Sequence, residues 1–127
     1  MTHKTINIAP VPAARPRVTA KGVYYPPAYD GYRKALPLLL RGLELYTEPI
    51  YVGLVFSIPM PKSWTQKKRA AKAGQYHDSR PDIDNYVKGA LDAMNGVVFL
   101  DDAQVAVIRA KKIWSYNGSI ELSINRL

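Results

Sequence analysis

Residues 80–105 read RPDIDNYVKGALDAMNGVVFLDDAQV and contain the clearest structural signal in the chain. Five apolar side chains in this stretch have the spacing of one helical face: Ile83, Val87, Ala90, Leu91 and Met94. Asn95-Gly96 supplies the stop of this helix, and the apolar run VVFL that follows predicts a short buried strand ending at Asp101-Asp102. Because the connection is short, helix and strand should lie side by side.

The flanking sequence adds strands and a further helix. Two-residue alternation predicts strands at residues 5–10, 51–58 and 119–125. Residues 104–114 are a further strand candidate, joined to the last strand by a turn at Asn117-Gly118. Residues 29–46 have a helical composition in which Pro37 should kink the helix or start a second one. Residues 10–27 predict a loop with an irregular hairpin that turns at Lys21-Gly22. We expect one α/β (α+β) domain over residues 1–127, its acid-bearing helix packed on a mixed sheet.

The composition excludes several kinds of site and indicates what the protein binds. The chain has no cysteine, which excludes disulfides and thiolate zinc sites, and only two histidines, His3 and His77. The N-terminus lacks a signal-peptide pattern and the run LPLLL is too short to span a membrane, so we expect a cytoplasmic protein. A net charge of +8 indicates a polyanionic partner. Nucleic acid is the expected one, because residues 62–80 hold six cations against one acid, Asp78. This basic arm has little apolar surface and should be mobile when alone.

Half of the ten acidic residues gather beside this arm: Asp82, Asp84, Asp92, Asp101 and Asp102. An ordinary explanation exists for the helix, where Asp82 could cap the N-terminus and Asp84 could pair with Lys88. The acids at the end of the predicted strand favour a functional explanation instead, because one of Asp101 and Asp102 must face the helix. Three carboxylates close together repel one another unless a cation lies among them, and oxygen ligands suit Mg²⁺ or Mn²⁺. With Lys88 positioned to stabilise charge on a phosphate, the pattern predicts a nuclease.

The same residues resemble a known family. The pattern D-x-D-N, a lysine four residues after the second Asp, then D-A-[LM] and D-D-[AS]-Q-V is similar to the signature of RusA-type Holliday junction resolvases, small dimeric endonucleases often carried by prophages. The segments PVPAARPRV and IPMPKSW also resemble that family. The resemblance implies a Mg²⁺-dependent endodeoxyribonuclease (Mn²⁺ being an alternative) that serves DNA recombination and repair by nicking four-way junctions symmetrically.

Position by position, the resemblance implies metal-binding catalytic acids at Asp82, Asp84 and Asp102 and an essential lysine at Lys88. It therefore favours Asp102 over Asp101, a choice that periodicity leaves open. Asn85, Asp92 and Asp101 are implied as supporting residues around these acids. Some relatives have a dense arginine run before the first Asp, where this chain has YHDSRP. The expected DNA-binding cations are therefore spread over the arm and the early loop: Lys67, Lys68, Arg69, Lys72, Arg80, Arg15 and Arg17.

Trp64 lies in the basic arm, where it could wedge between bases, although such a residue more often anchors a loop to the core. Tyr24, Tyr25 and Tyr29 are expected to pack or to line an interface. A four-way junction has approximate two-fold symmetry, so paired nicks require a C₂ homodimer. Two alternatives remain open: a non-catalytic phage or bacterial DNA-binding architectural protein, and a nuclease of the same fold that acts on flaps or forks.

Overall fold

The computed structural model describes all residues, 1–127, and is built around one central strand, β4 (Ile50–Pro59). Its side chains Val52, Leu54, Phe56 and Ile58 are all buried, as the alternation predicted. β4 pairs in parallel with β5 (Val105–Ser115) on one side and antiparallel with β6 (Ser119–Arg126) on the other. β1 (Thr2–Ile6) pairs with β6, so the strand order is β1-β6-β4-β5 and β5 is an edge strand.

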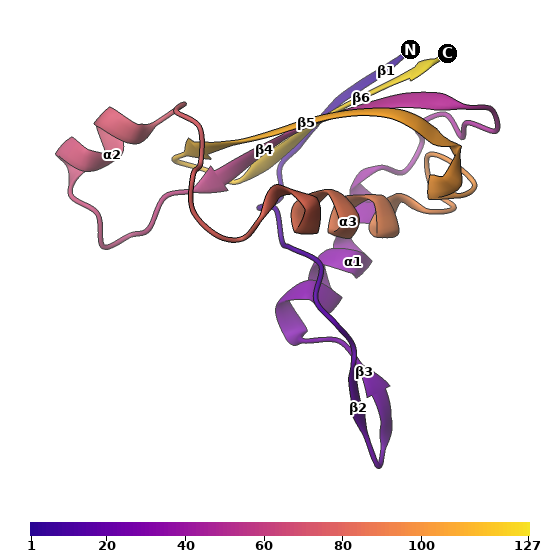
Figure 1. Cartoon of the computed structure of the whole chain (residues 1–127), viewed down its shortest axis with the longest axis horizontal. Helices are drawn as coiled ribbons and strands as arrows, with labels where there is room; N and C mark the ends of the chain where they lie inside the picture. Colours follow the sequence, from indigo (N-terminus) through magenta and orange to yellow (C-terminus); the bar gives the residue numbers. More distant parts are fainter.

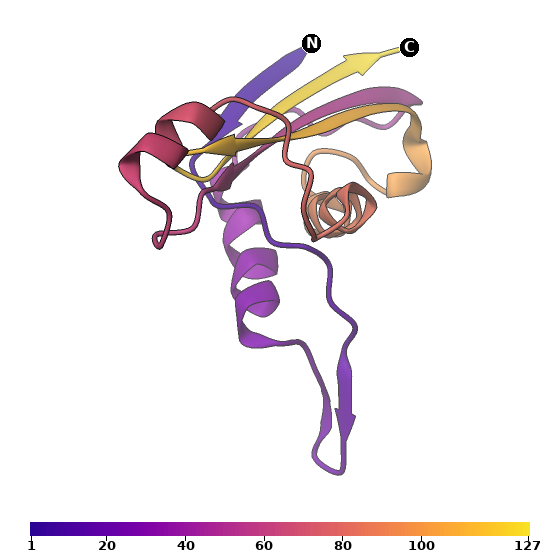
Figure 2. The same ribbon diagram turned by 60° about the vertical axis from the view of Figure 1, so that its left-hand side comes forward.

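Two helices cover one face of this sheet, α1 (Pro27–Leu39) and α3 (Ile83–Met94) (Figure 1). Seen from a second direction, both still lie on the same side of the strands (Figure 2). The ring of Tyr86 on α3 packs against Phe56 of β4, with 5.5 Å between ring centroids. The expected α+β domain with its acid-bearing helix on a mixed sheet is therefore confirmed.

Two smaller units project from this body. The hairpin of β2 (Arg17–Thr19) and β3 (Gly22–Tyr24) extends away from the sheet, and α2 (Gln66–Lys72) lies at one end of the molecule (Figure 1). The hairpin turns at Ala20-Lys21, close to the predicted position. None of the helices is both long enough and apolar enough to cross a membrane.

The structure corrects the reading of residues 97–100, which form a turn and not a buried strand. The amides of Val97 and Val98 both donate to the carbonyl of Met94, at 3.0 and 3.3 Å, so the chain folds back as soon as α3 ends. Val98 and Phe99 are buried, whereas Leu100 is 57% exposed. Asp101 and Asp102 therefore follow a tight turn, and their side chains are oriented by local hydrogen bonds.

The buried face of α3 is also rotated from the predicted one. Its buried side consists of Tyr86, Gly89, Ala90, Ala93 and Met94. Ile83, Val87 and Leu91 are only half-buried and lie along the flank of the helix that faces β5. Small residues at Gly89, Ala90 and Ala93 let neighbouring chain segments approach closely, a preference that the apolar spacing alone did not indicate.

Three further expectations differ in detail. β5 and β6 are joined by the predicted turn but do not pair, because β4 lies between them. α1 continues through Pro37 and ends two residues later, with no second helix before Tyr46. The first strand begins at Thr2 and ends at Ile6, so that Ile8 lies beyond it.

Candidate active site

The D-x-D acids lie at the start of α3. Asp82 is the N-cap residue, with extended backbone angles, and its side chain makes no capping hydrogen bond. Asp84 lies in the first turn, where its Oδ1 accepts a hydrogen bond from the amide of Asn85 at 3.0 Å. Lys112 of β5 fixes the approach to this helix, because its Nζ donates to the carbonyls of Ser79 (2.7 Å) and Pro81 (2.8 Å). Both acid side chains thus point to solvent from a well-anchored helix start.

The D-D-A-Q motif forms a 3₁₀ turn, η1 (Asp102–Gln104), held by a capping box. The Asp101 carboxylate accepts from the amide of Ala103, and the amide of Asp101 donates to Gln104 Oε1 at 2.9 Å. Gln104 Nε2 donates to the carbonyls of Tyr46 and Glu48, both at 3.0 Å, which ties the turn to the body. Asp101 therefore caps the turn, and the side chain of Asp102 takes no part in the capping.

Asp102 shares a hollow with three charged residues of α3. The amide of Asp102 donates to Asn95 Oδ1 at 2.8 Å, which fixes its backbone against the end of α3. The hollow lies between α3 and β5, and its charged lining consists of Asp84, Lys88, Asp92 and Asp102. Apolar side chains complete it, half-buried ones at Ile83, Val87, Leu91 and Ala110 and an exposed one at Ile108. Asp101 is not part of the lining.

The expected convergence of three carboxylates is wrong in one respect. No three acidic or histidine side chains lie close enough together to form a preassembled metal site. Asp84 and Asp102 line one hollow, but Asp82 does not contribute to it. Asp82 precedes the first turn of α3 and Asp84 lies within it, so the two side chains leave the helix in different directions. Mutual repulsion of the carboxylates also favours this separation.

Electrostatics around Asp102 reflect an excess of negative charge. Its pKa is raised above the usual range, first by a side-chain hydrogen bond with Asp101, then by burial and by the charges of Asp101 and Asp92. Lys88 acts in the opposite direction. The pKa of Asp101 is lowered, chiefly by that same hydrogen bond with Asp102 and by the amide of Ala103. The two neighbouring carboxyls thus titrate as a linked pair, and a cation beside them would be stabilised.

Lys88 is held loosely by Asp92. Its Nζ lies 3.4 Å from Asp92 Oδ2, in an i, i+4 pair whose lysine side chain is 68% exposed. Lys88, Asp92 and Asn85 also line a second hollow, whose opposite wall is formed by residues 13–16, Tyr25 and Tyr29. The two hollows therefore adjoin along α3, and Arg15 lies in the wall of the second one.

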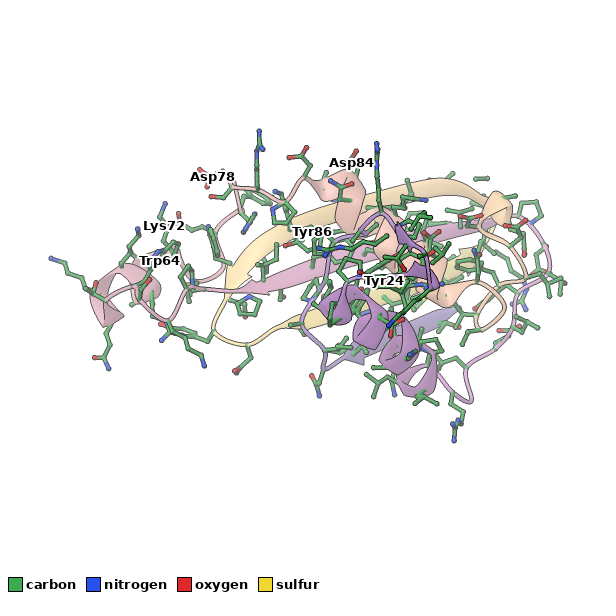
Figure 3. The ribbon with its side chains drawn as sticks, turned by 90° about the horizontal axis from the view of Figure 1, so that it is seen from below. Tyr24, Trp64, Lys72, Asp78, Asp84 and Tyr86 are labelled. Carbon is green, nitrogen blue, oxygen red and sulfur yellow. The ribbon has the colours of Figure 1, made fainter.

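The cations of the basic arm lie on α2, except Lys62 and Arg80, at a distance from α3 (Figure 3). Trp64 packs on Trp114 of β5 with 4.8 Å between ring centroids, so it anchors the arm, and the wedge is not supported. Lys68 lies over the ring of Trp64 (4.2 Å) and Arg69 over Tyr116 (5.4 Å), which leaves the other predicted contacts, Lys67, Lys72 and Arg80, without such aromatic partners.

The return segment of the arm pairs with β5. Gly74 donates to the carbonyl of Trp114 (2.8 Å), Trp114 to that of Gln75 (2.9 Å), and His77 to that of Lys112 (3.0 Å). These bonds cover part of the β5 edge and connect the arm to the segment before Asp82. The mobility of α2 itself stays a prediction.

Four supporting residues were not predicted as part of the site: Gly89, Asn95, Gln104 and Lys112. Gln104 had a readable signal, because an acid followed three residues later by Gln is a capping-box pattern. Asn95 was recognised only as a helix stop, and Gly89 only as a helical residue. Lys112 acts over a sequence distance of more than thirty residues, which no local pattern reveals.

An α+β domain that presents carboxylates and a lysine in one hollow, on a strongly basic chain, has the arrangement of a nuclease. The family model described as Endodeoxyribonuclease RusA matches residues 7–125. A protein of Bacillus subtilis (strain 168), the uncharacterized protein YqaN, is 31% identical over 134 residues, covering 97% of this chain and 94% of its own length. The chain belongs to the RusA endodeoxyribonuclease family, whose members are Holliday junction resolving endonucleases.

Proposed function

We propose that this chain is a divalent-metal-dependent endonuclease that resolves four-way DNA junctions by paired symmetric nicks. The observation that carries the proposal is the hollow between α3 and β5, which brings Asp84, Asp102 and Lys88 together in a chain of the RusA family. Carboxylates and an exposed lysine on a chain of net charge +8 suit a phosphodiester held against an acidic pocket.

The donor set fits a hard divalent cation. Asp84 and Asp102 offer carboxylate oxygens from two elements, and Asp82 has a side chain that no capping bond restrains. The raised pKa of Asp102 supports the fit, because it reflects negative charge that a cation would offset. In this proposal Asp82, Asp84 and Asp102 hold Mg²⁺ or Mn²⁺, which supplies polarisation of the phosphate and activation of water when bound.

Lys88 then stabilises the charge that develops on the scissile phosphate. An exposed i, i+4 ion pair contributes only about 0.3–0.5 kcal/mol, so a phosphate oxygen can readily replace Asp92 as the partner of Lys88. Asp92 keeps the ammonium group beside the hollow until DNA arrives. Asn85 and Asp101 support this arrangement from the backbone side, because the Asn85 amide donates to Asp84 and Asp101 caps η1.

Binding is proposed to extend beyond the hollow. Arg15 lies in the wall of the second hollow, and Arg17 begins the β2–β3 hairpin, which extends away from α3 (Figure 1). The cations of the arm lie on α2, beyond the N-terminal end of α3, or just before α3: Lys67, Lys68, Arg69, Lys72 and Arg80. Two protomers related by a C₂ axis would present two such hollows to the two symmetric strands of a junction. Sedimentation that finds only monomer, both free and on junction DNA, would contradict the homodimer.

The test is cleavage of a four-way junction, a flap, a fork and a linear duplex of matched sequence, each with Mg²⁺ or with EDTA. Asp84→Asn is the active-site variant, and Asp78→Asn is the control because Asp78 is an exposed acid on the arm (Figure 3). We expect paired symmetric nicks in the junction alone, lost with EDTA and in Asp84→Asn but kept in Asp78→Asn.

Other outcomes identify the alternatives. Preferred cleavage of flaps or forks would assign the chain to a different branched substrate. Tight junction binding without cleavage in Mg²⁺ or Mn²⁺, with an affinity set by salt alone, would favour a non-catalytic architectural protein.

A further inference from the structure

The β2–β3 hairpin is a two-faced ribbon with every strand residue exposed. Val18 is directly opposite Val23, and Arg17 is directly opposite Tyr24. Because opposite residues share a face and successive residues alternate, the two valines form one face and Arg17, Thr19 and Tyr24 the other. Val18 is 80% exposed and Val23 is 65% exposed. An isolated two-stranded hairpin is at best marginally stable in water, so an uncovered valine pair needs an explanation.

The hairpin is nevertheless held in a defined position. At its tip, Thr19 Oγ1 accepts from the amide of Lys21 (3.2 Å) and donates to the carbonyl of Gly22 (3.1 Å). At its root, the amide of Ala13 donates to the carbonyl of Asn85 on α3 at 2.9 Å. On the other strand, Tyr25 packs edge-on against Tyr29 of α1, with 5.4 Å between ring centroids. The root is thus fixed on both helices, and the tip projects into solvent (Figure 2).

The root of the hairpin also borders the candidate active site. Residues 13–16 and Tyr25 form one wall of the hollow whose other wall carries Asn85, Lys88 and Asp92. Lys88 and Asp92 are shared with the hollow that contains Asp84 and Asp102. A DNA strand lying at these acids therefore passes the root of the hairpin, from which β2 and β3 extend (Figure 2).

The charge of the hairpin and its root favours DNA as the partner. Between residues 7 and 29 there are three cations, Arg15, Arg17 and Lys21, and no acid. A phosphate backbone attracts an arm that carries cations and no acid. A two-stranded ribbon also has a width that a DNA groove admits.

We infer that the β2–β3 hairpin is the branch-recognising arm of this protein, with Val18 and Val23 packed on unstacked bases at the crossover of a four-way junction. Arg15, Arg17 and Lys21 contact the flanking phosphates. An apolar pair gains little from the polar exterior of a continuous duplex, but it gains from base faces that only a branch point exposes. This inference rests on the proposed function and assigns its substrate selectivity to residues outside the acidic hollow.

The test uses the full chain in EDTA, so that binding is measured without cleavage. Val18→Thr/Val23→Thr keeps the shape and strand preference of the pair and removes its apolar surface. We expect the affinity for a four-way junction to fall about tenfold or more, and the affinity for a matched duplex to stay within about twofold. Val107→Thr is the control, because Val107 is an exposed valine on β5 outside both hollows.

Two further readouts separate the roles of valines and cations. 2-Aminopurine placed at the crossover should brighten on binding wild type and should stay quenched with the double variant. Lys21→Gln should reduce the salt dependence of binding to both DNAs by about one counterion. Lys4→Gln on β1, far from the hairpin, should not change it.

Three results would overturn the inference. The folded double variant could keep wild-type junction preference, it could lose junction and duplex binding equally, or it could become monomeric where wild type is dimeric. Failure of the proposed function looks different: wild type would bind the junction selectively through the hairpin but cleave it in neither Mg²⁺ nor Mn²⁺.

Discussion

Gly89→Ala should destabilise the protein although it replaces glycine by the best helix former. In the middle of α3, a Cβ at residue 89 would lie 2.9 Å from the carbonyl oxygen of Val11 and 3.1 Å from the amide nitrogen of Ala13. Both contacts are backbone atoms, so residues 11–13 must move to make room. That movement strains or breaks the hydrogen bond from Ala13 to Asn85.

The expected magnitude follows from opposing terms. Alanine gains about 1 kcal/mol over glycine inside a helix. Overpacking against fixed atoms costs about 1–3 kcal/mol, and losing one backbone hydrogen bond costs about 1 kcal/mol more. The net loss is roughly 1–3 kcal/mol, with roughly 3–6 °C of Tm for each kcal/mol in a domain of this size.

Gly31→Ala is the matched control. Gly31 also lies inside a helix, α1, but a Cβ there would meet nothing within 4 Å. It should therefore stabilise the protein by about 0.5–1 kcal/mol. Urea unfolding followed by circular dichroism measures both variants. The close-approach reasoning fails if Gly89→Ala is as stable as Gly31→Ala. Junction binding by Gly89→Ala should also weaken, because residues 11–13 lead into the hairpin.

Three further perturbations address other parts of the site. Lys112→Met should lower the free energy of unfolding by about 1–3 kcal/mol, since two charge-assisted hydrogen bonds to carbonyls are lost, and a urea midpoint equal to wild type would contradict this role. Burial, followed by the charge of Lys112, lowers the pKa of His77 in the folded protein. As the pH falls below about 6.5, His77 is therefore protonated in the unfolded chain before it is protonated in the folded one. The contribution of neutral His77 to the free energy of unfolding is therefore complete above that pH and declines toward pH 5. His77→Phe should make this decline in Tm shallower in thermal melts. Asp84→Asn should be at least as stable as wild type, and Mg²⁺ should raise the Tm of wild type more than that of the variant; a large loss of stability would instead make Asp84 a structural residue.

The sequence predicted well those elements whose pattern is local. The helix of residues 83–94, the buried alternation of β4 and the strand that became β6 each repeat with a fixed period over a whole element. Thr65, which precedes α2 and accepts from the amide of Lys68, is a local capping signal of the same kind that was not used in the prediction. These features require only the chain near them, so periodicity and capping chemistry suffice.

Features that depend on distant segments were predicted less well. The buried face of α3 differs from the predicted one, and residues 11–13 lie against Gly89 on that face. β4 lies between β5 and β6 although a short turn joins those two strands. Residues 97–100 are apolar enough for a strand, but only Phe99 pairs with other segments, in isolated bridges to Tyr46 and Asn95. The choice of Asp102 over Asp101 rested on the resemblance to a family, although the capping-box spacing of Asp101 and Gln104 was a readable signal that Asp101 caps the turn.

The two acidic motifs are held in place by groups that carry no negative charge. Lys112 fixes the chain before Asp82, while Asn95 and Gln104 fix the turn that contains Asp102. Asp82 makes no capping hydrogen bond and Asp102 is anchored through its backbone amide, so the side chains of both acids remain available to a ligand. A phosphate drawn to a chain of net charge +8 meets three carboxylates and one ammonium group at the hollow. Long-range attraction and short-range repulsion thus oppose each other at this place, and a bound cation, as proposed, would offset the repulsion.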